Sequence, residues 1–214
     1  MKKTPRQAGR PRTLDRDAAL DAAMRLFWER GYEGTSVADL AQAMHMTPPS
    51  IYEAFGDKEA LFRKALARYQ AGRAEEWGPV LAGAPAERAV VELIARSVEK
   101  ATRPGDPTGC LVSGTPGACS PKNAAALLAA TEARERFVAE VEDRLAQGVR
   151  AAEVDAKADM AAIARFVAAV LQGISTQARD GVPRETLDAV ASLGIAAVKL
   201  ALRPVDPPES GPAR

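Results

Sequence analysis

Histidine and cysteine carry much of the catalytic and metal-binding chemistry of proteins, and this chain of 214 residues contains only His45, Cys110 and Cys119. A serine-histidine-aspartate triad would have to use His45, which lies in a predicted turn, and no zinc-site spacing occurs. The carboxylates are scattered at helix-surface spacing, without an apolar shell that would shift a pKa. The sequence therefore predicts no enzymatic activity, no metal site and no cofactor.

A different chemistry, contact with nucleic-acid bases, is available to the segment 47–53, TPPSIYE. Threonine and serine hydroxyls can hydrogen-bond several bases, a glutamate can accept from cytosine, and a proline ring can touch a thymine methyl group. Neither Arg nor Asn occurs in the segment, so the usual bidentate contacts with bases are missing. Recognition of the DNA must therefore depend more on phosphate contacts and on DNA shape. We expect base contacts from Thr47, Pro48, Pro49, Ser50 and Glu53.

Two short helices joined by a tight turn must position this segment. The apolar residues at positions 37, 40, 41 and 44 recur at the spacing of one helical face, and Ser36 with Asp39 forms a variant of the capping box. After the turn, Thr47 can cap a second helix that begins with two prolines, where a missing N–H costs little. Ile51 and Phe55 face inward. The result is a helix of about eight residues that presents its N-terminal side chains outward, as a major-groove reader requires.

With these motifs in register, residues 10–62 resemble the N-terminal DNA-binding domain of the TetR family of bacterial transcriptional repressors. The resemblance implies phosphate contacts from the Tyr52 hydroxyl and from Lys58. The chain departs from the family at His45 and Pro49, where the family usually or frequently has glycine. We expect His45 to adopt a positive φ, with a phosphate contact as the alternative, because histidine is enriched in that conformation. The matching segments are 22–27 with Gly31, 35–37 with 39–41, Ile51 and Tyr52 with Phe55, and 57–59 with Leu61 and Phe62.

Further contacts with the DNA backbone are expected from the N-terminal arm and from the start of the first short helix. Residues 1–16 carry six basic residues and one acidic residue, whereas the whole chain has a net charge of +1. Arg10 and Arg12 in this arm are expected to touch phosphates or the minor groove, with a solvated tail as the alternative. At Thr35 and Ser36 the free N–H groups of a helix start favour a phosphate, with ordinary N-capping as a compatible alternative.

The remainder of the chain reads as helices. Abundant alanine, few aromatic residues and the absence of β-branched alternation favour an all-α class. Apolar spacing predicts helices near residues 13–30, 58–76, 85–102, 122–152, 159–180 and 184–202. No apolar run approaches the roughly 18 residues of a membrane span, and the basic start lacks the apolar segment of a signal peptide. We therefore expect a cytoplasmic protein with reduced cysteines.

A small-molecule pocket is implied by the resemblance for the C-terminal helices. Residues 103–121 are rich in Gly and Pro, and a loop of this length in a compact domain is usually functional, so we expect it to line or cover the pocket. Gly109 to Gly114 superficially begins a phosphate loop, but the required Lys-Ser/Thr does not follow, which excludes nucleotide binding there. Buried packing is the first interpretation of Cys110, and redox sensing the second. The predicted lining residues are Cys110, Phe137 and Phe166.

An interface between two subunits is predicted for the last two helices. Their apolar residues cover a wider arc than one core requires, and small residues let the helices approach closely. In the resembled family these helices form a four-helix dimer bundle, and a plain intramolecular core is the alternative. The predicted interface residues are Val167, Val170, Leu171, Ile174, Val190, Leu193, Gly194 and Ala197.

These expectations define an N-terminal three-helix DNA-binding domain with a helix-turn-helix, followed by a C-terminal helical ligand-binding and dimerisation domain. The predicted division is a basic flexible arm (1–12), the DNA-binding domain (13–58), the effector and dimerisation domain (59–203) and a disordered tail (204–214). The predicted function is a homodimeric transcriptional regulator, a repressor released from a palindromic double-stranded operator by a small-molecule effector. The alternatives are an architectural or co-regulatory DNA-binding protein without an effector and, with less support, a helical enzyme.

Overall fold

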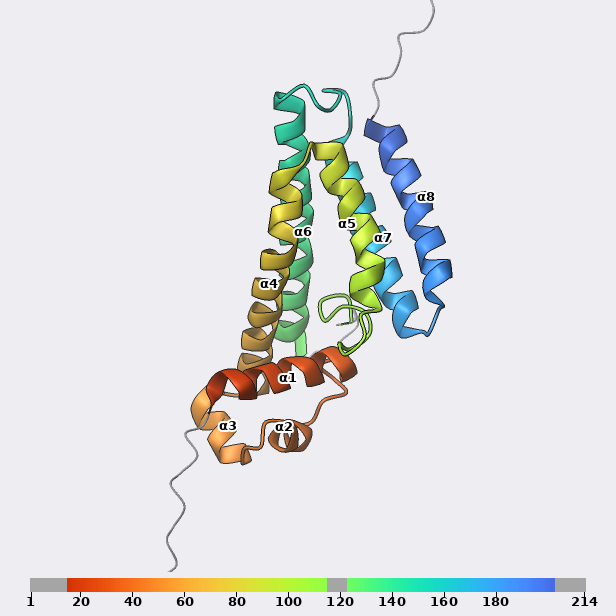
Figure 1. Ribbon diagram of the computed structural model, residues 1–214. Coiled ribbons are helices and arrows are strands. Elements are labelled where there is room, and N and C mark those ends of the chain that lie inside the picture. Colours follow the sequence, from red (N-terminus) through yellow and green to blue (C-terminus); the bar gives the residue numbers. More distant parts are fainter. Residues whose placement is uncertain (1–14, 115–122, 203–214) are drawn as a thin grey trace, which may run out of the picture.

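The computed structural model describes residues 15–114 and 123–202. These residues contain eight α-helices and no strand (Figure 1). The predicted all-α class is confirmed. Arg10, Arg12 and Cys119 lie outside the described residues. The helices are α1 (Arg16–Arg30), α2 (Val37–Ala43), α3 (Pro48–Phe55), α4 (Lys58–Gly83), α5 (Ala86–Ala101), α6 (Ala124–Arg150), α7 (Met160–Arg179) and α8 (Arg184–Leu202).

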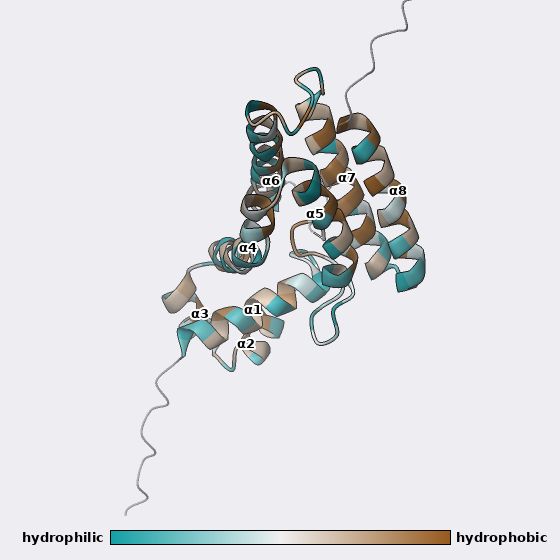
Figure 2. Ribbon diagram, turned by 45° about the horizontal axis from the view of Figure 1, so that its top comes forward, coloured by the Kyte–Doolittle hydropathy of each residue, from teal (hydrophilic) through white to brown (hydrophobic). Residues whose placement is uncertain are grey.

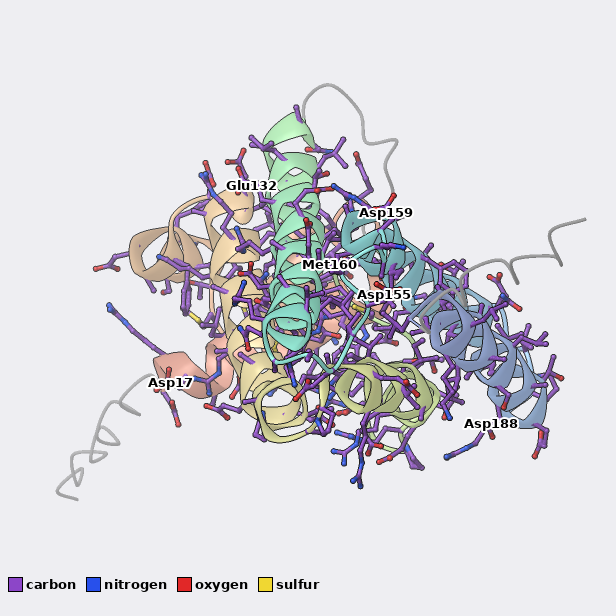
Figure 3. The ribbon with its side chains drawn as sticks, turned by 90° about the horizontal axis from the view of Figure 1, so that it is seen from above. Asp17, Glu132, Asp155, Asp159, Met160 and Asp188 are labelled. Atoms are coloured by element: carbon purple, nitrogen blue, oxygen red, sulfur yellow. The ribbon has the colours of Figure 1, made fainter. Side chains whose placement is uncertain are left out.

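Helices α4 to α8 run alongside one another, α1 lies across one end of this bundle, and α2 and α3 lie beyond α1 (Figure 1). Helix α4 joins the two parts, because it packs on α1 at one end and on α5 and α6 along the rest of its length. Helix α8 packs on α5 and α7 at the outer edge of the bundle. Seen from above, Asp17 of α1 and Asp188 of α8 therefore lie at opposite sides of the molecule (Figure 3). None of the helices in the described ranges combines the length and hydrophobicity that crossing a membrane requires.

Two hydrophobic cores hold these parts together. The N-terminal core includes the rings of Phe27 and Phe62, which meet edge to face with their centroids 5.2 Å apart. This core continues beyond residue 58, where we placed the domain boundary, to Tyr69 on α4, and it takes in Leu111 and Val112 from the loop after α5. The DNA-binding part predicted from the sequence therefore shares its core with the loop predicted to line a ligand pocket.

The predicted cap residues start the short helices. The hydroxyl of Ser36 accepts a hydrogen bond from the N–H of Asp39 at 3.1 Å, and the Asp39 carboxylate accepts one from the N–H of Ser36 at 2.9 Å, which completes the capping box. Thr47 caps α3, and Asp57 caps α4 by accepting from the N–H of Ala60 at 2.8 Å. The two short helices and α4 thus begin where the sequence predicted.

Helix α4 continues seven residues beyond its predicted end near Glu76, through Gly78 and Pro79 to Gly83, so the predicted end is wrong. Pro79 is exposed inside the helix, while its neighbour Trp77 is buried in the C-terminal core and Leu81 packs against that core. Packing of these apolar side chains outweighs the local cost of a proline in a helix.

Candidate nucleic-acid interface and ligand cavity

Helix α3 turns its apolar side into the N-terminal core and its polar side outward. Ile51 and Phe55 are 2% and 5% exposed, whereas Tyr52 is 49% exposed. The helix is thereby fixed by two buried side chains and presents its remaining face to the surroundings. The residues predicted to contact bases are exposed (Thr47, Pro48, Pro49 and Glu53) or half-buried (Ser50).

The N-terminus of α3 is held by hydrogen bonds among its own polar groups. The Thr47 hydroxyl lies 2.9 Å from the Ser50 hydroxyl and accepts from the N–H of Ser50 at 3.4 Å. Each hydroxyl keeps further hydrogen-bonding capacity, because an O–H group has one donor and two acceptor sites. Pro48 and Pro49 occupy the first helical turn, where their fixed φ matches the helix. The two hydroxyls therefore project from a preformed helix start.

The turn before α3 and the C-terminus of α3 contain residues with positive φ, and a lysine binds the C-terminus. His45 is exposed and has a φ of +52°, as expected for its turn position. Gly56, with a φ of +86°, ends α3. Lys64 of α4 donates from Nζ to the Phe55 carbonyl oxygen at 3.1 Å, so it ties the C-terminus of α3 to α4. Sequence reasoning missed Lys64, because a contact between consecutive helices leaves no periodic pattern.

Lys58 lies at the start of α4 with its ammonium group over an aromatic ring. Its Nζ is 4.3 Å from the centre of the Tyr32 ring. Burial lowers the pKa of Lys58, and the nearby carboxylate of Glu33 opposes that shift. The ring contacts one side of the ammonium group, which has three N–H donors in total. The geometry therefore leaves Lys58 able to bind a phosphate while the ring restricts its position.

The structure does not support a phosphate contact from the side chain of Thr35. Thr35 is fully buried, and its hydroxyl donates to the Gly31 carbonyl oxygen at 2.7 Å, closing the turn between α1 and α2. Ser36 is exposed, but its hydroxyl and its N–H are both hydrogen-bonded to Asp39. These hydrogen bonds, assisted by Arg30 at 3.2 Å, hold the pKa of Asp39 below its ordinary value of 3.8. A carboxylate of the chain itself therefore occupies this helix start.

A cavity of about 60 Å³ lies among α4, α5, α6, α7 and the loop after α5. Cys110 and Phe137, both predicted as lining residues, line this cavity. Phe166 does not: it is 42% exposed on α7 and lines a separate groove with residues of α8. Trp77 is buried in the C-terminal core and also lines the cavity.

The cavity wall contains polar groups with contrasting surroundings. Burial, aided by a hydrogen bond with Cys110, raises the pKa of Tyr69 well above its ordinary value of 10.0. Ser175 is 4% exposed, and its hydroxyl has no hydrogen-bond partner within the described ranges. A buried hydroxyl without a partner is unfavourable unless something else binds it. The Ser175 hydroxyl is therefore available to a ligand.

Arg179, the last residue of α7, connects the cavity wall to α1. Its Nη2 donates to the Trp28 carbonyl oxygen at 2.6 Å and to the Cys110 carbonyl oxygen at 3.1 Å. Burial lowers the pKa of Arg179 from its ordinary value of 12.5. A side chain added at Gly109 or Gly114 would collide with the Arg179 side chain, so this close approach requires glycine at both positions. Arg179 and Trp28 are 151 residues apart, which explains why the sequence did not reveal this connection.

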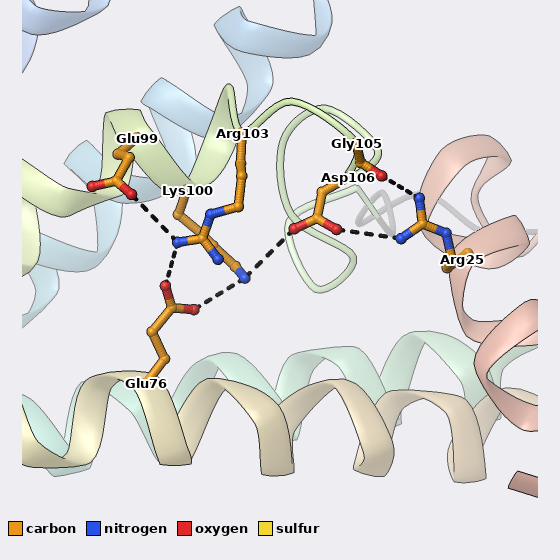
Figure 4. A network of polar contacts seen from close by, with 7 residues as sticks. All are labelled: Arg25, Glu76, Glu99, Lys100, Arg103, Gly105 and Asp106. Carbon is orange, nitrogen blue, oxygen red and sulfur yellow. Dashed lines mark hydrogen bonds and ion pairs between the residues drawn. The ribbon is translucent and has the colours of Figure 1, made fainter. Parts of the chain in front are cut away.

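A chain of charged side chains makes a second connection to α1 (Figure 4). Arg25 of α1 donates to the Gly105 carbonyl oxygen at 2.5 Å and pairs with Asp106 at 3.3 Å. Asp106 lies 4.0 Å from the Nζ of Lys100, which pairs with Glu76 of α4 at 3.0 Å. The loop after α5 is therefore joined to α1 on one side and to α4 on the other.

The predicted dimer interface is only partly at the surface of the subunit. Val167 and Ile174 are fully buried inside the core, so they cannot contact a second copy in this fold. Gly194 is buried where α8 meets α7, and a Cβ there would lie 3.1 Å from Val170. For these residues the intramolecular alternative is the correct one. Val170, Leu171 and Val190 are half-buried, and Leu171 lines the cavity.

Two of the predicted interface residues, Leu193 and Ala197, are exposed, together with Phe166 and Leu200 on the same two helices. Hydrophobic residues are concentrated along these two helices (Figure 2). Leu193 and Leu200 are 74% and 72% exposed, which is unusual for leucine side chains on one helix. Periodicity identified α7 and α8 correctly but could not tell which side of each helix the rest of the chain covers. We call these exposed residues the α7–α8 stripe: Phe166, Leu193, Ala197 and Leu200.

Comparison with known proteins extends over almost the whole chain. The family model described as bacterial regulatory proteins, tetR family, matches residues 19–65. The chain is 34% identical over 188 residues to the HTH-type transcriptional repressor ComR of Escherichia coli (strain K12), which covers 86% of this chain and 88% of ComR. It is 28% identical over 206 residues to the repressor BdcR of the same strain, covering 94% of this chain and 98% of BdcR.

Solved structures show the same architecture. A cysteine mutant of the TetR family transcriptional regulator CifR, complexed with 26-base-pair double-strand operator DNA, is 43% identical and superposes with a TM-score of 0.84. The match covers 88% of this chain and 99% of the CifR chain. A regulator from Cytophaga hutchinsonii, at 20% identity, shares the fold with a TM-score of 0.76.

Proposed function

Because the chain belongs to the TetR family of bacterial regulatory proteins, we propose that it is a homodimeric repressor that a small molecule releases from an operator of two-fold symmetry. It is a DNA-binding transcriptional regulator, and proteins of this family are generally not enzymes. It acts in the cytoplasm, where bacterial operators lie. The observation that carries the proposal is α3, which is fixed by Ile51 and Phe55 and exposes the polar residues at its start.

In this proposal α3 reads bases in the major groove while its flanks bind phosphates. The exposed α3 residues include Glu53 and no cation, so attraction to the DNA backbone must come from neighbouring segments. Tyr52 is suited to that role by its exposure and Lys58 by its position at the start of α4, and Arg10 and Arg12 of the basic arm add to it. Specificity comes from the residues at the start of α3, Thr47, Pro48, Pro49, Ser50 and Glu53, and, because bidentate Arg or Asn contacts are missing, from DNA shape.

Two copies pair through the α7–α8 stripe. Leu193 and Leu200 lie about two helical turns apart on one face of α8 and form the kind of exposed apolar surface that a second subunit covers. A two-fold axis along this surface presents two α3 helices to one side of the DNA. The operator is then an inverted repeat whose half-sites lie about one helical turn, ~34–36 Å, apart.

Release by a ligand uses the cavity and Arg179. A molecule that enters the cavity meets the segment 109–113, whose Cys110 carbonyl oxygen accepts from Arg179. Displacing that segment shifts Arg179 away from the Trp28 carbonyl oxygen and frees the end of α1 to tilt. The ligand can lower operator affinity by no more than the factor by which its own affinity differs between the two arrangements.

Selection of bound fragments from a random DNA pool by the full-length protein tests this function. The expected result is an inverted repeat with half-sites about one helical turn apart. Ser50→Ala should change the preferred base at one symmetric pair of positions, whereas Ser192→Ala, at an exposed serine on α8, should leave the sequence unchanged. Enrichment of no sequence, or of one without two-fold symmetry, contradicts the proposal.

A further inference from the structure

The charged residues of the cavity wall all have the same sign. Arg73, Lys100 and Arg134 line the cavity, and among the described residues no aspartate or glutamate does. The apolar part of the wall includes Trp77, Phe137 and Leu171. An apolar space with an excess of positive charge favours an anionic ligand, because electrostatic attraction is stronger where water is scarce.

The three cations differ in how they are already engaged. Lys100 pairs with Glu76 at 3.0 Å, so its charge is largely neutralised within the protein. Arg134 donates to the Val112 carbonyl oxygen at 3.1 Å and to the Thr131 hydroxyl at 2.8 Å, so it helps to shape the wall. Their positions are therefore explained by contacts within the chain.

Arg73 has a different environment. Its guanidinium carbon lies 4.2 Å from the centre of the Phe137 ring and 5.0 Å from that of Trp77. Within the described ranges its nitrogens form no hydrogen bond and no ion pair, although the residue is half-buried. Two aromatic rings thus hold a guanidinium group at the cavity wall with its planar array of N–H donors unused.

We propose that the effector is a small amphipathic carboxylate, whose carboxylate group pairs with Arg73 and whose apolar body lies against Phe137 and Leu171. This inference rests on the proposed function, because it assigns a chemical class to the molecule that releases the DNA. A guanidinium group binds a carboxylate through two parallel N–H···O bonds, which fixes the orientation of the acid. The unpartnered hydroxyl of Ser175 offers a further hydrogen bond inside the same cavity.

The size of the cavity limits the effector. The cavity measures about 60 Å³, less than half of the roughly 150 Å³ that accommodates benzene in an engineered protein cavity. It therefore takes a short chain as it stands. Arg73, Trp77 and Phe137 also line an outer groove between α4 and α6, so a longer acid can extend outward past them.

Other ligand classes fit the wall less well. A cationic amine would meet three positive side chains without a carboxylate partner on the wall. A neutral hydrophobic molecule would remove water from Arg73 without replacing its hydrogen bonds, which is unfavourable for a charged group. The carboxylate is the class that satisfies Arg73.

Calorimetric titration of the full-length protein with matched ligands tests the proposal. The ligands are straight-chain carboxylates of two to ten carbons, the corresponding primary amides and the corresponding amines. We expect at least one carboxylate to bind about tenfold or more tightly than its amide, and the amine to bind most weakly. Equal affinity of acid and amide at every chain length, preference for the amine, or no binding by any carboxylate overturns the proposal.

Substitution of Arg73 tests whether this residue causes the preference for a carboxylate over its amide. In Arg73→Gln the preference for acid over amide should fall to less than about twofold, while Arg73→Lys should retain part of it. Arg150→Gln is the matched control, because Arg150 is an exposed arginine of α6 that lines neither the cavity nor the outer groove. Thermal unfolding monitored by circular dichroism establishes that the variants fold. An acid preference that survives in folded Arg73→Gln contradicts the role of Arg73.

A DNA-binding measurement separates this inference from the proposed function. With the operator obtained from the random pool, the preferred carboxylate should lower operator affinity at least about tenfold and its amide should not. If a symmetric operator is recovered but no carboxylate is preferred, the inference fails and DNA-binding regulation stands. If a carboxylate binds but no symmetric operator is recovered, the proposed function fails and the inference, which rests on it, fails as well.

Discussion

At the scale of single residues, a hydroxyl group can contact DNA only if it is exposed and keeps hydrogen-bonding capacity that the protein itself does not use. Thr35 and Thr47 both stand at the beginning of short helices, but Thr35 is buried with its hydroxyl on Gly31, whereas Thr47 is exposed beside Ser50. The chain therefore offers hydroxyls to DNA at α3 and uses the one at Thr35 for its own turn.

Lys58 provides a test of phosphate binding. Lys58→Ala should weaken binding about equally for all DNA sequences and lower the slope of log affinity against log salt by about 1, because one phosphate contact is lost. Fluorescence anisotropy with operator and scrambled duplexes over a range of salt concentrations measures both effects. Arg96→Ala, at an exposed arginine on α5, is the control. Unchanged affinity in folded Lys58→Ala would remove this residue from the interface.

At the scale of elements, α1 is the helix to which the cavity region is attached. Arg179 reaches it through the Trp28 carbonyl oxygen, and the loop after α5 reaches it through Arg25. Helix α1 in turn packs on α2, so a movement of α1 also displaces α2 and α3. The two attachments allow separate predictions.

Arg179→Met should uncouple ligand binding from DNA release. The carboxylate that binds the wild-type protein should bind the variant within about twofold, whereas its effect on operator affinity should shrink to less than about twofold. The free energy of unfolding of the variant should also be about 1–3 kcal/mol lower than that of the wild-type protein, because two carbonyl oxygens lose their hydrogen-bond donor. Arg165→Met, a substitution on the same helix as Arg179 that breaks the exposed ion pair with Glu135 of α6, should leave the coupling intact. Full release by ligand in Arg179→Met contradicts the coupling route.

Glu76 should make the stability of the protein sensitive to acid. Burial raises the pKa of Glu76, but the hydrogen bonds from Arg103 and Lys100 outweigh it, so the net pKa lies below the ordinary 4.5. Its stabilising contribution is therefore complete above pH 4.5 and is lost as the pH falls through the lower folded pKa.

Urea unfolding between pH 3 and pH 6 measures this contribution. Glu76→Gln should lower the free energy of unfolding by about 1 kcal/mol at pH 6 and should flatten its decline in acid. Glu140→Gln, at an exposed carboxylate on α6, serves as the control. An acid limb identical to that of the wild-type protein would exclude Glu76 as a contributor.

Features encoded by neighbouring residues could be predicted from the sequence, and features that depend on distant residues could not. The caps at Ser36 and Thr47, the positive φ of His45 and the ends of most helices follow from local chemistry. The continuation of α4 through Pro79 depends on packing by other helices, and the Arg179 connection spans 151 residues. At the candidate sites, sequence reasoning placed Cys110 and Phe137 in the cavity wall, but it missed Ser175 and Arg73 because an unused donor is a property of the folded surroundings.

At the scale of the whole molecule, the α7–α8 stripe bears on assembly. Leu193→Asp should shift the protein from dimer to monomer, because a carboxylate at the centre of an apolar contact would be buried without a partner. Sedimentation velocity at several concentrations detects the change, and operator affinity should fall because one subunit contacts one half-site. Leu128→Asp, at a leucine 58% exposed on α6, should remain dimeric. A dimeric Leu193→Asp, or a monomeric wild-type protein, contradicts the proposed interface.

The close approach of Arg179 to Gly114 has a consequence for the regulatory state of the protein. One methyl group at position 114 occupies the space of the Arg179 guanidinium and pushes it aside. Since that side chain can move, the strain is relieved at the bond to Trp28 and the subunit still folds. Gly114→Ala should therefore be a permanently induced allele: operator binding weakened about tenfold with nothing bound, as gel-shift titration would reveal. A single methyl group would then have the same effect on DNA binding as the effector.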